Sequence, residues 1–320
     1  MKTHSAGIHH ITAIAGDPQA NLDFYAGTLG LRLVKKTVNF DDPTTYHFYF
    51  GDRFGRPGTI LTFFPAGYPA PRGKPGSGQV TAVAFSAPAG AREFWTGRLR
   101  DEKVVVDQPG RRFDTDMIAF RDPDGLKLEI IFSDDGAESS DDGGPLPGEY
   151  AIRGFHSATI TVRDVAATAE LLTGTLGFSF STEQNGRQLF KADGEGCGKM
   201  VELEQIPQAT WGRIGPGAVH HIAWRTASDD TQNVLLGELT RMGFYVSPVT
   251  DRLYFHSIYF REPGGVLFEV ATDPPGFTVD EKAGELGGRL TLPPSLENRR
   301  EALERVLPPV SFPVQGKTGR

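Results

Sequence analysis

The chain of 320 residues is long for a single hydrophobic core and predicts two domains of about 150 residues each. A net charge of −7 and a pI of about 5.7 argue against nucleic acid as a main partner, because a phosphate-binding face needs a basic excess. No apolar run reaches the roughly 20 residues that span a bilayer, and the N-terminus lacks the apolar core of a signal peptide. The single Cys197 excludes an internal disulfide. Together these features predict a cytoplasmic protein without a membrane partner.

The predicted elements repeat one unit four times, at a pitch of roughly 70 residues. Each unit opens with an apolar, β-branched strand, expected at Ile8–Ile14, Val80–Phe85, Phe155–Val162 and Val219–Arg225. The first helix is expected to start at Asp17 as N-cap, with Pro18 behind it, and to stop at Gly30. The other helices are expected near Ala89–Leu99, Val165–Leu176 and Asp230–Met242. Three further strands complete each unit, which is therefore a βαβββ module.

Short motifs recur at matching places in these modules. Gly-Thr-Leu-Gly closes a helix at 27–30 and again at 174–177. A tight turn, Asp-Pro-Asp-Gly at 122–125 and Glu-Pro-Gly-Gly at 262–265, precedes an apolar run that ends in Glu129 or Glu269. The pair His9-His10 recurs as His220-His221, each opening an apolar run.

The acidic, glycine-rich stretch Ser133–Gly148 separates modules two and three and is predicted to be a linker, with a long surface loop as the alternative. We therefore predict an N-terminal domain over 1–135 and a C-terminal domain over 149–273, each built from two modules. A tail over 274–320 follows, with a short helix expected at Ser295–Val306 between two Pro-Pro pairs.

Aligning the four modules defines two positions that carry chemistry. The second histidine of each pair marks a first-strand position, which the modules fill with His10, Thr81, Ser157 and His221. The residue that ends the last strand marks a second position, filled with Thr62, Glu129, Glu202 and Glu269. The two positions lie 48 residues apart in both module two and module four, so the register of these modules is the best defined.

The alignment predicts one metal site, with His10, His221 and Glu269 as ligands. Two histidines and one carboxylate with open remaining positions form the ligand set of non-haem Fe(II) oxygenases, and zinc also accepts such a set. A lone strand histidine is usually a packing residue, but the two pairs use four of the eight histidines at equivalent positions. Modules two and three offer Glu129 without a histidine and are expected to hold a degenerate site.

The ligand set also predicts how the modules pair. A cup is built from the first and last strands of two modules, so the third ligand must come from the partner of module four. Module three offers Ser157 there, whereas module one offers His10. We therefore expect one to pair with four and two with three within a chain. Exchange of modules between two chains of a homo-oligomer would meet the same requirement.

The chain resembles the vicinal oxygen chelate superfamily, which includes glyoxalase I, extradiol dioxygenases and bleomycin-resistance proteins. It is most similar to the ring-cleaving branch that includes hydroquinone 1,2-dioxygenases. The resemblance rests on Gly-Ile-His-His-Ile-Thr at 7–12, Val-His-His-Ile-Ala at 219–223 and the run 251–269. It implies an α+β fold in which four βαβββ modules form two vicinal oxygen chelate domains with curved mixed sheets.

The same resemblance implies an Fe(II)-dependent ring-cleaving dioxygenase for a small hydroquinone-type or related dihydroxylated aromatic substrate and O2, with Mn(II) or Zn(II) as alternative metals. It implies the ligands His10, His221 and Glu269, and catalytic pocket roles for His9, Thr12, His220, Arg252 and Tyr259. In that mechanism Arg252 stabilises negative charge, and His220 or Tyr259 moves the proton. Arg252 is equally compatible with a surface ion pair, and Tyr259 with strand packing.

Two other functions suit the fold. A glyoxalase-like metal-dependent lyase or isomerase would need a carboxylate or amide where Thr62 stands. A non-catalytic small-molecule-binding protein would need no complete metal triad.

Overall fold

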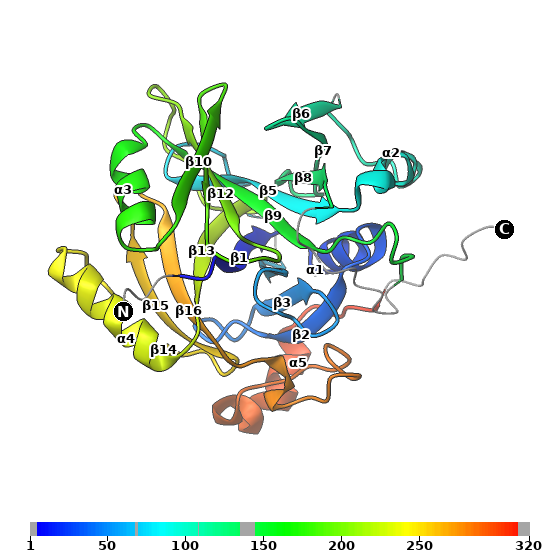
Figure 1. The fold of residues 1–320 in the computed structure, drawn as a ribbon. Coiled ribbons are helices and arrows are strands. Elements are labelled where there is room, and N and C mark those ends of the chain that lie inside the picture. The colour runs from blue at the N-terminus through cyan, green and yellow to red at the C-terminus, as the bar shows by residue number, and fades with distance from the viewer. Residues whose placement is uncertain (1–4, 68–69, 108, 135–144, 313–320) are drawn as a thin grey trace.

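The computed structural model describes residues 5–67, 70–107, 109–134 and 145–312, which form two eight-stranded mixed sheets with helices around them (Figure 1). The strand order is β14-β15-β16-β13-β1-β4-β3-β2 in the first sheet and β10-β11-β12-β9-β5-β8-β7-β6 in the second. Four βαβββ modules account for both sheets, as predicted. Most of the predicted linker Ser133–Gly148 lies outside the described residues.

The first sheet contains β1 (Ile8–Ala15), β2 (Arg32–Val38), β3 (Tyr46–Gly51), β4 (Ile60–Pro65), β13 (Ala218–Thr226), β14 (Thr250–Asp251), β15 (Phe255–Arg261) and β16 (Leu267–Pro275). The second contains β5 (Gln79–Ala87), β6 (Gly110–Arg112), β7 (Thr115–Arg121), β8 (Lys127–Phe132), β9 (Gly154–Val162), β10 (Ser179–Gln184), β11 (Arg187–Lys191) and β12 (Met200–Gln205). The helices and helical turns are α1 (Pro18–Leu22), η1 (Asp23–Thr28), η2 (Ala89–Ala91), α2 (Arg92–Asp101), α3 (Ala166–Gly174), α4 (Asp229–Arg241), η3 (Phe277–Val279), η4 (Pro294–Arg299) and α5 (Arg300–Val306).

The two sheets are joined across the halves of the chain. Strand β1 pairs antiparallel with β13, which confirms that module one pairs with module four. Strand β5 pairs antiparallel with β9, which confirms the pairing of two with three. Each sheet therefore takes half its strands from either half of the chain, and the residue boundaries predicted for two sequential domains stay predictions.

The structure corrects one step of the module alignment. In module four the first-strand histidine lies two residues before the strand partner of the glutamate. In module two the partner of Glu129 is Ala84, so Ala82 rather than Thr81 takes the histidine's position. Thr81 is the bulged residue of β5, as His9 is in β1, so it takes the place of the first histidine of a pair rather than the second. Equal spacing along the sequence could not reveal this.

The first helix shows how local sequence sets these elements. The Asp17 side chain accepts a hydrogen bond from the Ala20 amide, and Pro18 occupies the first turn, as predicted. The helix widens into the π-helical turn η1, and Gly30 beyond it has a φ of 69°, a left-handed conformation that suits glycine.

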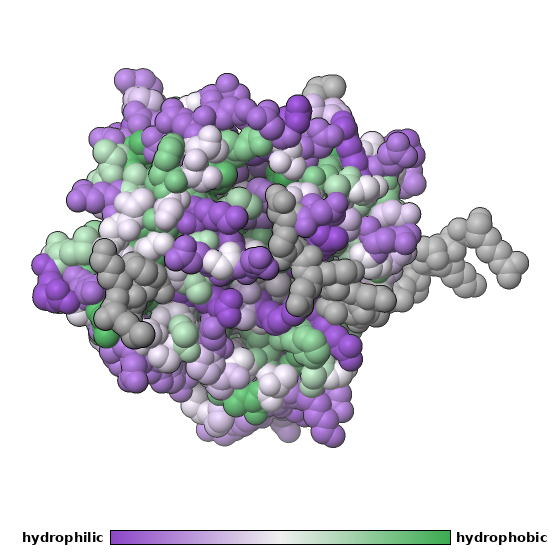
Figure 2. All heavy atoms as spheres, in the orientation of Figure 1, coloured by the Kyte–Doolittle hydropathy of each residue, from purple (hydrophilic) through white to green (hydrophobic). Residues whose placement is uncertain are grey.

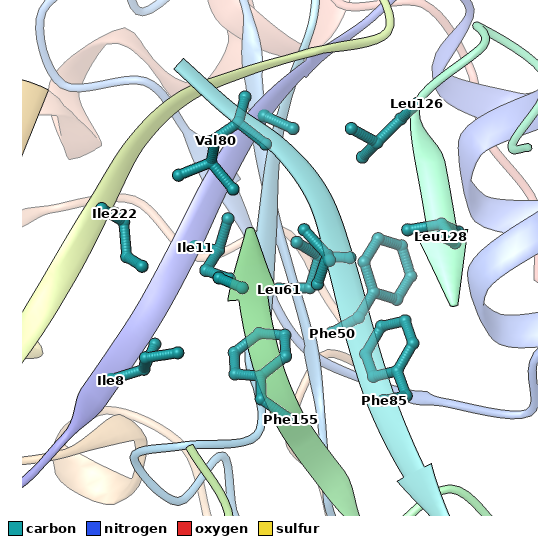
Figure 3. Packing of buried hydrophobic residues seen from close by; sticks show 14 of the residues in the cluster. Ile8, Ile11, Phe50, Leu61, Val80, Phe85, Leu126, Leu128, Phe155 and Ile222 are labelled. Carbon is teal, nitrogen blue, oxygen red and sulfur yellow. The ribbon is translucent and has the colours of Figure 1, made fainter. Parts of the chain in front are cut away.

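Strand alternation separates the hydrophobic core from the functional face of each sheet. Ile11 of β1 and Leu61 of β4 belong to the same buried cluster as Phe85 of β5 and Phe155 of β9 (Figure 3). The rings of Phe85 and Phe155 stack with centroids 5.7 Å apart. The two sheets pack against each other through this shared core, and the opposite face of the first sheet is left for polar residues.

The outer surface is largely polar, with apolar residues in small groups on the face shown in Figure 2. Among the described residues, no helix is both long enough and apolar enough to cross a membrane.

The C-terminal tail lies along the edge strand β2, where the predicted short helix is present as η4 and α5 (Figure 1). Lys35 of β2, whose side chain is fully buried, forms ion pairs with Asp280 and Glu281 and donates to the Phe277 carbonyl. The Phe277 ring packs against Tyr49 of β3 at 5.1 Å. The tail therefore supports one wall of the site described next.

Candidate active site

Three strands bring the predicted ligands to one face of the first sheet. Ala223 of β13 pairs with Glu269 of β16 in parallel register, so His221, two residues earlier, points to the same side as Glu269. Thr12 of β1 pairs with His221, and His10 shares the face of Thr12. The three side chains therefore converge from β1, β13 and β16, as the module alignment predicted.

The converging atoms have the spacing of metal ligands. His221 Nε2 lies 2.9 Å from Glu269 Oε2, His10 Nε2 lies 3.3 Å from the same oxygen, and the two Nε2 atoms are 3.4 Å apart. Ligand atoms about 2.1 Å from one ion and at right angles to each other stand about 3.0 Å apart. Within the described chain, this is the one group of three or more His, Cys, Asp or Glu side chains arranged to hold an ion.

Electrostatics at the triad favour a cation. Glu269 is fully buried, and Ser257 Oγ donates to its Oε1. Its Oε2 lies close to both histidines but has no aligned hydrogen-bond donor among the described residues. Burial opposes ionisation, but His10 and His221 outweigh it and hold the pKa of the Glu269 carboxyl well below its usual range. Burial lowers the pKa of His221 and so keeps it neutral, the form that binds a metal. The residues present therefore fit a divalent ion.

Each histidine of the triad is held by the histidine before it in the sequence. His9 Nδ1 lies 2.9 Å from His10 Nδ1, and His220 Nδ1 lies 2.8 Å from His221 Nδ1. Burial lowers the pKa of His9 well below its usual range and that of His220 to about 4, so both are neutral at pH 7. A histidine that binds a metal through Nε2 carries its proton on Nδ1, which then donates to the ring of the preceding histidine, His9 or His220.

His9 and His220, the two histidines that precede the triad histidines, differ in where they lie. His9 packs behind His10 against the Phe255 ring, with centroids 5.1 Å apart, and hydrogen-bonds the backbone of Thr272. His220 lies in the wall of the cavity beside Phe64. The pocket role that the resemblance implies for His9 therefore corresponds in the structure to contact with a ligand, not with the cavity.

The triad lies in the wall of a cavity of about 450 Å3 that also contains Thr12, His220, Arg252 and Tyr259 from the predicted set. Its walls are strongly aromatic, with Phe40, Tyr49, Phe64, Phe255 and Tyr259. A cavity of this size and lining suits a small aromatic molecule.

Arg252 and Tyr259 form one polar side of the cavity. Arg252 Nε donates to the Tyr259 hydroxyl at 3.1 Å, and its Nη1 pairs with Asp41 Oδ2 at 3.1 Å. Arg252 is therefore both an ion-pair partner and a cavity residue. Burial raises the pKa of Tyr259, and the negative charge of Glu269 adds to the effect, so the phenol stays neutral.

Sequence reasoning missed two cavity residues on β3, His47 and Tyr49. His47 Nε2 lies 2.9 Å from Thr62 Oγ1, and its Nδ1 lies 2.9 Å from the Tyr49 hydroxyl. A signal was present, because Tyr49 pairs with Thr62 on β4 as Tyr259 pairs with Glu269 on β16. Extending the module alignment to these middle strands would have matched Tyr49 with Tyr259.

The equivalent cup of the second sheet holds an ion-pair cluster. The Arg112 guanidinium bridges two fully buried carboxylates, at 2.8 Å from Glu129 Oε1 and 2.5 Å from Glu202 Oε2. Ser157 Oγ donates to Glu202 at 2.8 Å, and Lys127 Nζ lies 2.9 Å from Glu129. Arg112, together with Lys127 beside Glu129 and Arg187 beside Glu202, thus neutralises the carboxylates that stand where Glu269 stands in the first sheet.

The sequence model of the Glyoxalase/Bleomycin resistance protein/Dioxygenase superfamily matches residues 7–130 and 154–270. The chain belongs to this superfamily. This confirms the resemblance that the paired histidines predicted.

Individual relatives match almost the whole chain. The Bacillus subtilis protein named "Putative ring-cleaving dioxygenase MhqO" is 44% identical over 310 residues, covering 97% of this chain and 98% of that protein. The chlorohydroquinone/hydroquinone 1,2-dioxygenase of Sphingobium indicum is 36% identical over 308 residues, covering 94% of this chain and 95% of that protein. A crystal structure titled as a "putative dioxygenase" from Bacillus subtilis superposes with a TM-score of 0.92 at 42% identity, covering 97% of this chain and 99% of that one.

Proposed function

We propose that this chain is an Fe(II)-dependent dioxygenase that cleaves the ring of hydroquinone-type substrates. The observation that carries the proposal is the convergence of His10, His221 and Glu269 in the wall of an aromatic cavity of about 450 Å3. The names of relatives that match nearly the whole chain support it, one of them a hydroquinone 1,2-dioxygenase.

The three ligands would hold the metal on one face and leave its other positions toward the cavity. Fe(II) bound there supplies Lewis acidity toward a phenolic oxygen and redox activity toward O2, whereas Mn(II) or Zn(II) would fit the same donors. Both atoms of O2 enter the product as one ring carbon–carbon bond breaks between a hydroxyl-bearing carbon and its neighbour.

The side chains of the cavity have separate tasks in this reaction. Phe64 and Phe255 bury the faces of a substrate ring and keep water from it. The Arg252 guanidinium is a fixed positive group that stabilises a phenolate oxygen. Its hydrogen bond to Tyr259 keeps the phenol in the cavity wall, where Tyr259 or His220 moves the substrate proton.

Anaerobic reconstitution with Fe(II), followed by oxygen-uptake assays with hydroquinone and catechol, tests the proposal. We expect one Fe(II) per chain and stoichiometric oxygen uptake with hydroquinone. The variants His10→Ala, His221→Ala and Glu269→Ala should each lose most metal and all turnover, because each removes a ligand. Full iron content and turnover in His10→Ala would contradict the ligand assignment, and no reaction with either phenol would redirect the search to glyoxalase-like isomerisation.

A further inference from the structure

A chain of three hydrogen bonds runs from the tail side of the cavity to the metal side. The Tyr49 hydroxyl lies 2.9 Å from His47 Nδ1, and His47 Nε2 lies 2.9 Å from Thr62 Oγ1. Thr62 Oγ1 in turn donates to Thr12 Oγ1 at 2.9 Å. The chain ends at Thr12, two residues after the ligand His10 on β1.

The direction of this chain follows from the chemistry of its first member. Tyr49 is 2% exposed, and its hydroxyl has one hydrogen and one polar neighbour among the described residues, His47 Nδ1. A buried phenol does not leave its hydrogen unused, so Tyr49 donates and His47 Nδ1 accepts. A neutral imidazole that accepts at Nδ1 carries its hydrogen on Nε2 and donates to Thr62.

The remaining steps bring the chain to the cavity. The Thr62 hydroxyl oxygen accepts a hydrogen bond from His47, and the Thr62 hydroxyl hydrogen is donated to Thr12 Oγ1. Thr12 therefore accepts on its oxygen and keeps a hydrogen, for which the described part of the chain provides no acceptor. Thr12 lies in the cavity wall with His10 but has no exposed surface of its own, so the hydrogen is available only to a molecule that packs directly against this wall.

We propose that His47 is a positioning residue, held as its Nε2–H tautomer between Tyr49 and Thr62, which makes the Thr12 hydroxyl a hydrogen-bond donor to an oxygen atom of the bound substrate. The proposal rests on the proposed function, because a phenolic oxygen is the acceptor it supplies. If these hydrogen bonds had the opposite direction, Thr12 would present a lone pair to that oxygen and repel it.

The environment of His47 keeps it in this form. A protonated His47 would donate from both nitrogens and collide with the Tyr49 hydrogen. Burial lowers the pKa of His47 well below its usual range, and the positive charge of Arg252 acts in the same direction. The ring is also held by the tilted rings of Tyr49 and Phe64, whose centroids lie 4.0 Å and 4.3 Å from its own.

The module repeat shows that this place in the fold supports a functional group. Ser257 on β15 occupies the position equivalent to His47 and donates to Glu269, a metal ligand. His47 makes the matching contact to Thr62, which cannot bind a metal as a glutamate does. The same contact thus supports a ligand in module four and a substrate donor in module one.

The tautomer is measured directly on the Zn(II)-loaded protein, which is diamagnetic, with 15N-labelled histidine. The 15N shifts of the two ring nitrogens separate both neutral tautomers from the imidazolium, and His47→Gln identifies the signals. We expect His47 to remain the Nε2–H tautomer from pH 6 to pH 8. An Nδ1–H tautomer, or an imidazolium at pH 7, overturns the proposal whatever the enzyme's substrate is.

Ligand binding provides a second measurement. Anaerobic titration of the Zn(II)-loaded protein with hydroquinone should show roughly threefold to tenfold weaker binding for His47→Leu, the loss expected for one hydrogen bond. His47→Gln places an amide N–H near Nε2 and should restore most of the affinity. Chelator competition should show unchanged Zn(II) affinity in both variants, because His47 is not a ligand.

The outcomes separate the two proposals. Equal hydroquinone affinity in His47→Leu and the native protein overturns the role of His47. If the native protein does not bind hydroquinone, the substrate in the proposed function is wrong. The tautomer of His47 alone then decides the direction of the hydrogen bonds from Tyr49 to Thr12.

Discussion

Replacing His9 should weaken metal binding more than it slows the reaction. His9 accepts from His10 Nδ1 at 2.9 Å and is anchored by its own bond to the Thr272 backbone, so it fixes the rotation of a ligand ring. His9→Leu removes the acceptor and leaves a buried donor on His10 without a partner. His9→Asn is the matched control, because its side-chain oxygen is able to stand near the place of Nδ1.

The size of the effect follows from that single contact. An unsatisfied buried donor costs about 1–3 kcal/mol, and loss of a partner behind a metal ligand typically lowers affinity 10- to 100-fold. We expect His9→Leu to bind Zn(II) about tenfold to 100-fold more weakly and His9→Asn to recover part of that loss. Turnover at saturating metal should fall much less, because His9 packs behind His10 against Phe255.

Zn(II) competition with a chromophoric chelator measures the affinity, and thermal unfolding of the metal-free proteins checks that each variant is folded. If His9→Leu bound Zn(II) as tightly as the native protein, the orienting role would be wrong. Equal losses in His9→Leu and His9→Asn would show that packing against Phe255, not the hydrogen bond, is what matters.

Three further predictions concern charged and ionisable groups away from the triad. Glu129→Gln should leave metal content unchanged by elemental analysis but destabilise the fold by about 3 kcal/mol in denaturant unfolding, because the buried ion pair with Arg112 is broken. Lys35→Met should cost about 3–5 kcal/mol, since the buried Glu281 loses its close cation and keeps only Arg289 at 3.9 Å, and adding Glu281→Gln should restore part of the loss. Burial raises the pKa of Cys197 to about 11, so the thiol is protonated at pH 8, and native protein should react with iodoacetamide roughly 100-fold more slowly than free cysteine or urea-unfolded chain; equal rates would contradict this.

The repeat made most of the fold and the convergence of all three proposed ligands predictable. Strand alternation and turn motifs marked the modules, and the requirement that one cup contain two histidines selected the pairing of module one with module four. The pairing could be inferred without knowledge of contacts between distant residues, because all ligands of one metal ion have to lie in the same module pair. The structure confirmed it through the antiparallel pairing of β1 with β13.

What the sequence did not predict depended on register and on contacts between strands. Thr81 is the bulged residue of β5 and matches His9 rather than His10, which the spacing to Glu129 did not show. His47 has no histidine in the equivalent place of module four, where Ser257 stands, so the repeat gave no signal for its type. His9 and His220 read alike in the sequence, and only packing separates a ring behind a ligand from one in the cavity wall.

The charges in the two sheets give a physical reason why the proposed metal would bind at only one of the two equivalent sites. In the second sheet, Glu129 and Glu202 are buried with no exposed surface, and the side chains of Arg112, Lys127 and Arg187 supply the compensating charge within the chain. In the first sheet, Glu269 is equally buried, but its neighbours are two histidines whose neutral form binds metals. A divalent cation there more than offsets the single carboxylate and leaves a net positive charge facing the cavity. That charge favours a phenolate over a neutral phenol, because the ionised oxygen returns the buried centre to neutrality. Arg252 adds to the preference to the extent that Asp41 does not already neutralise it.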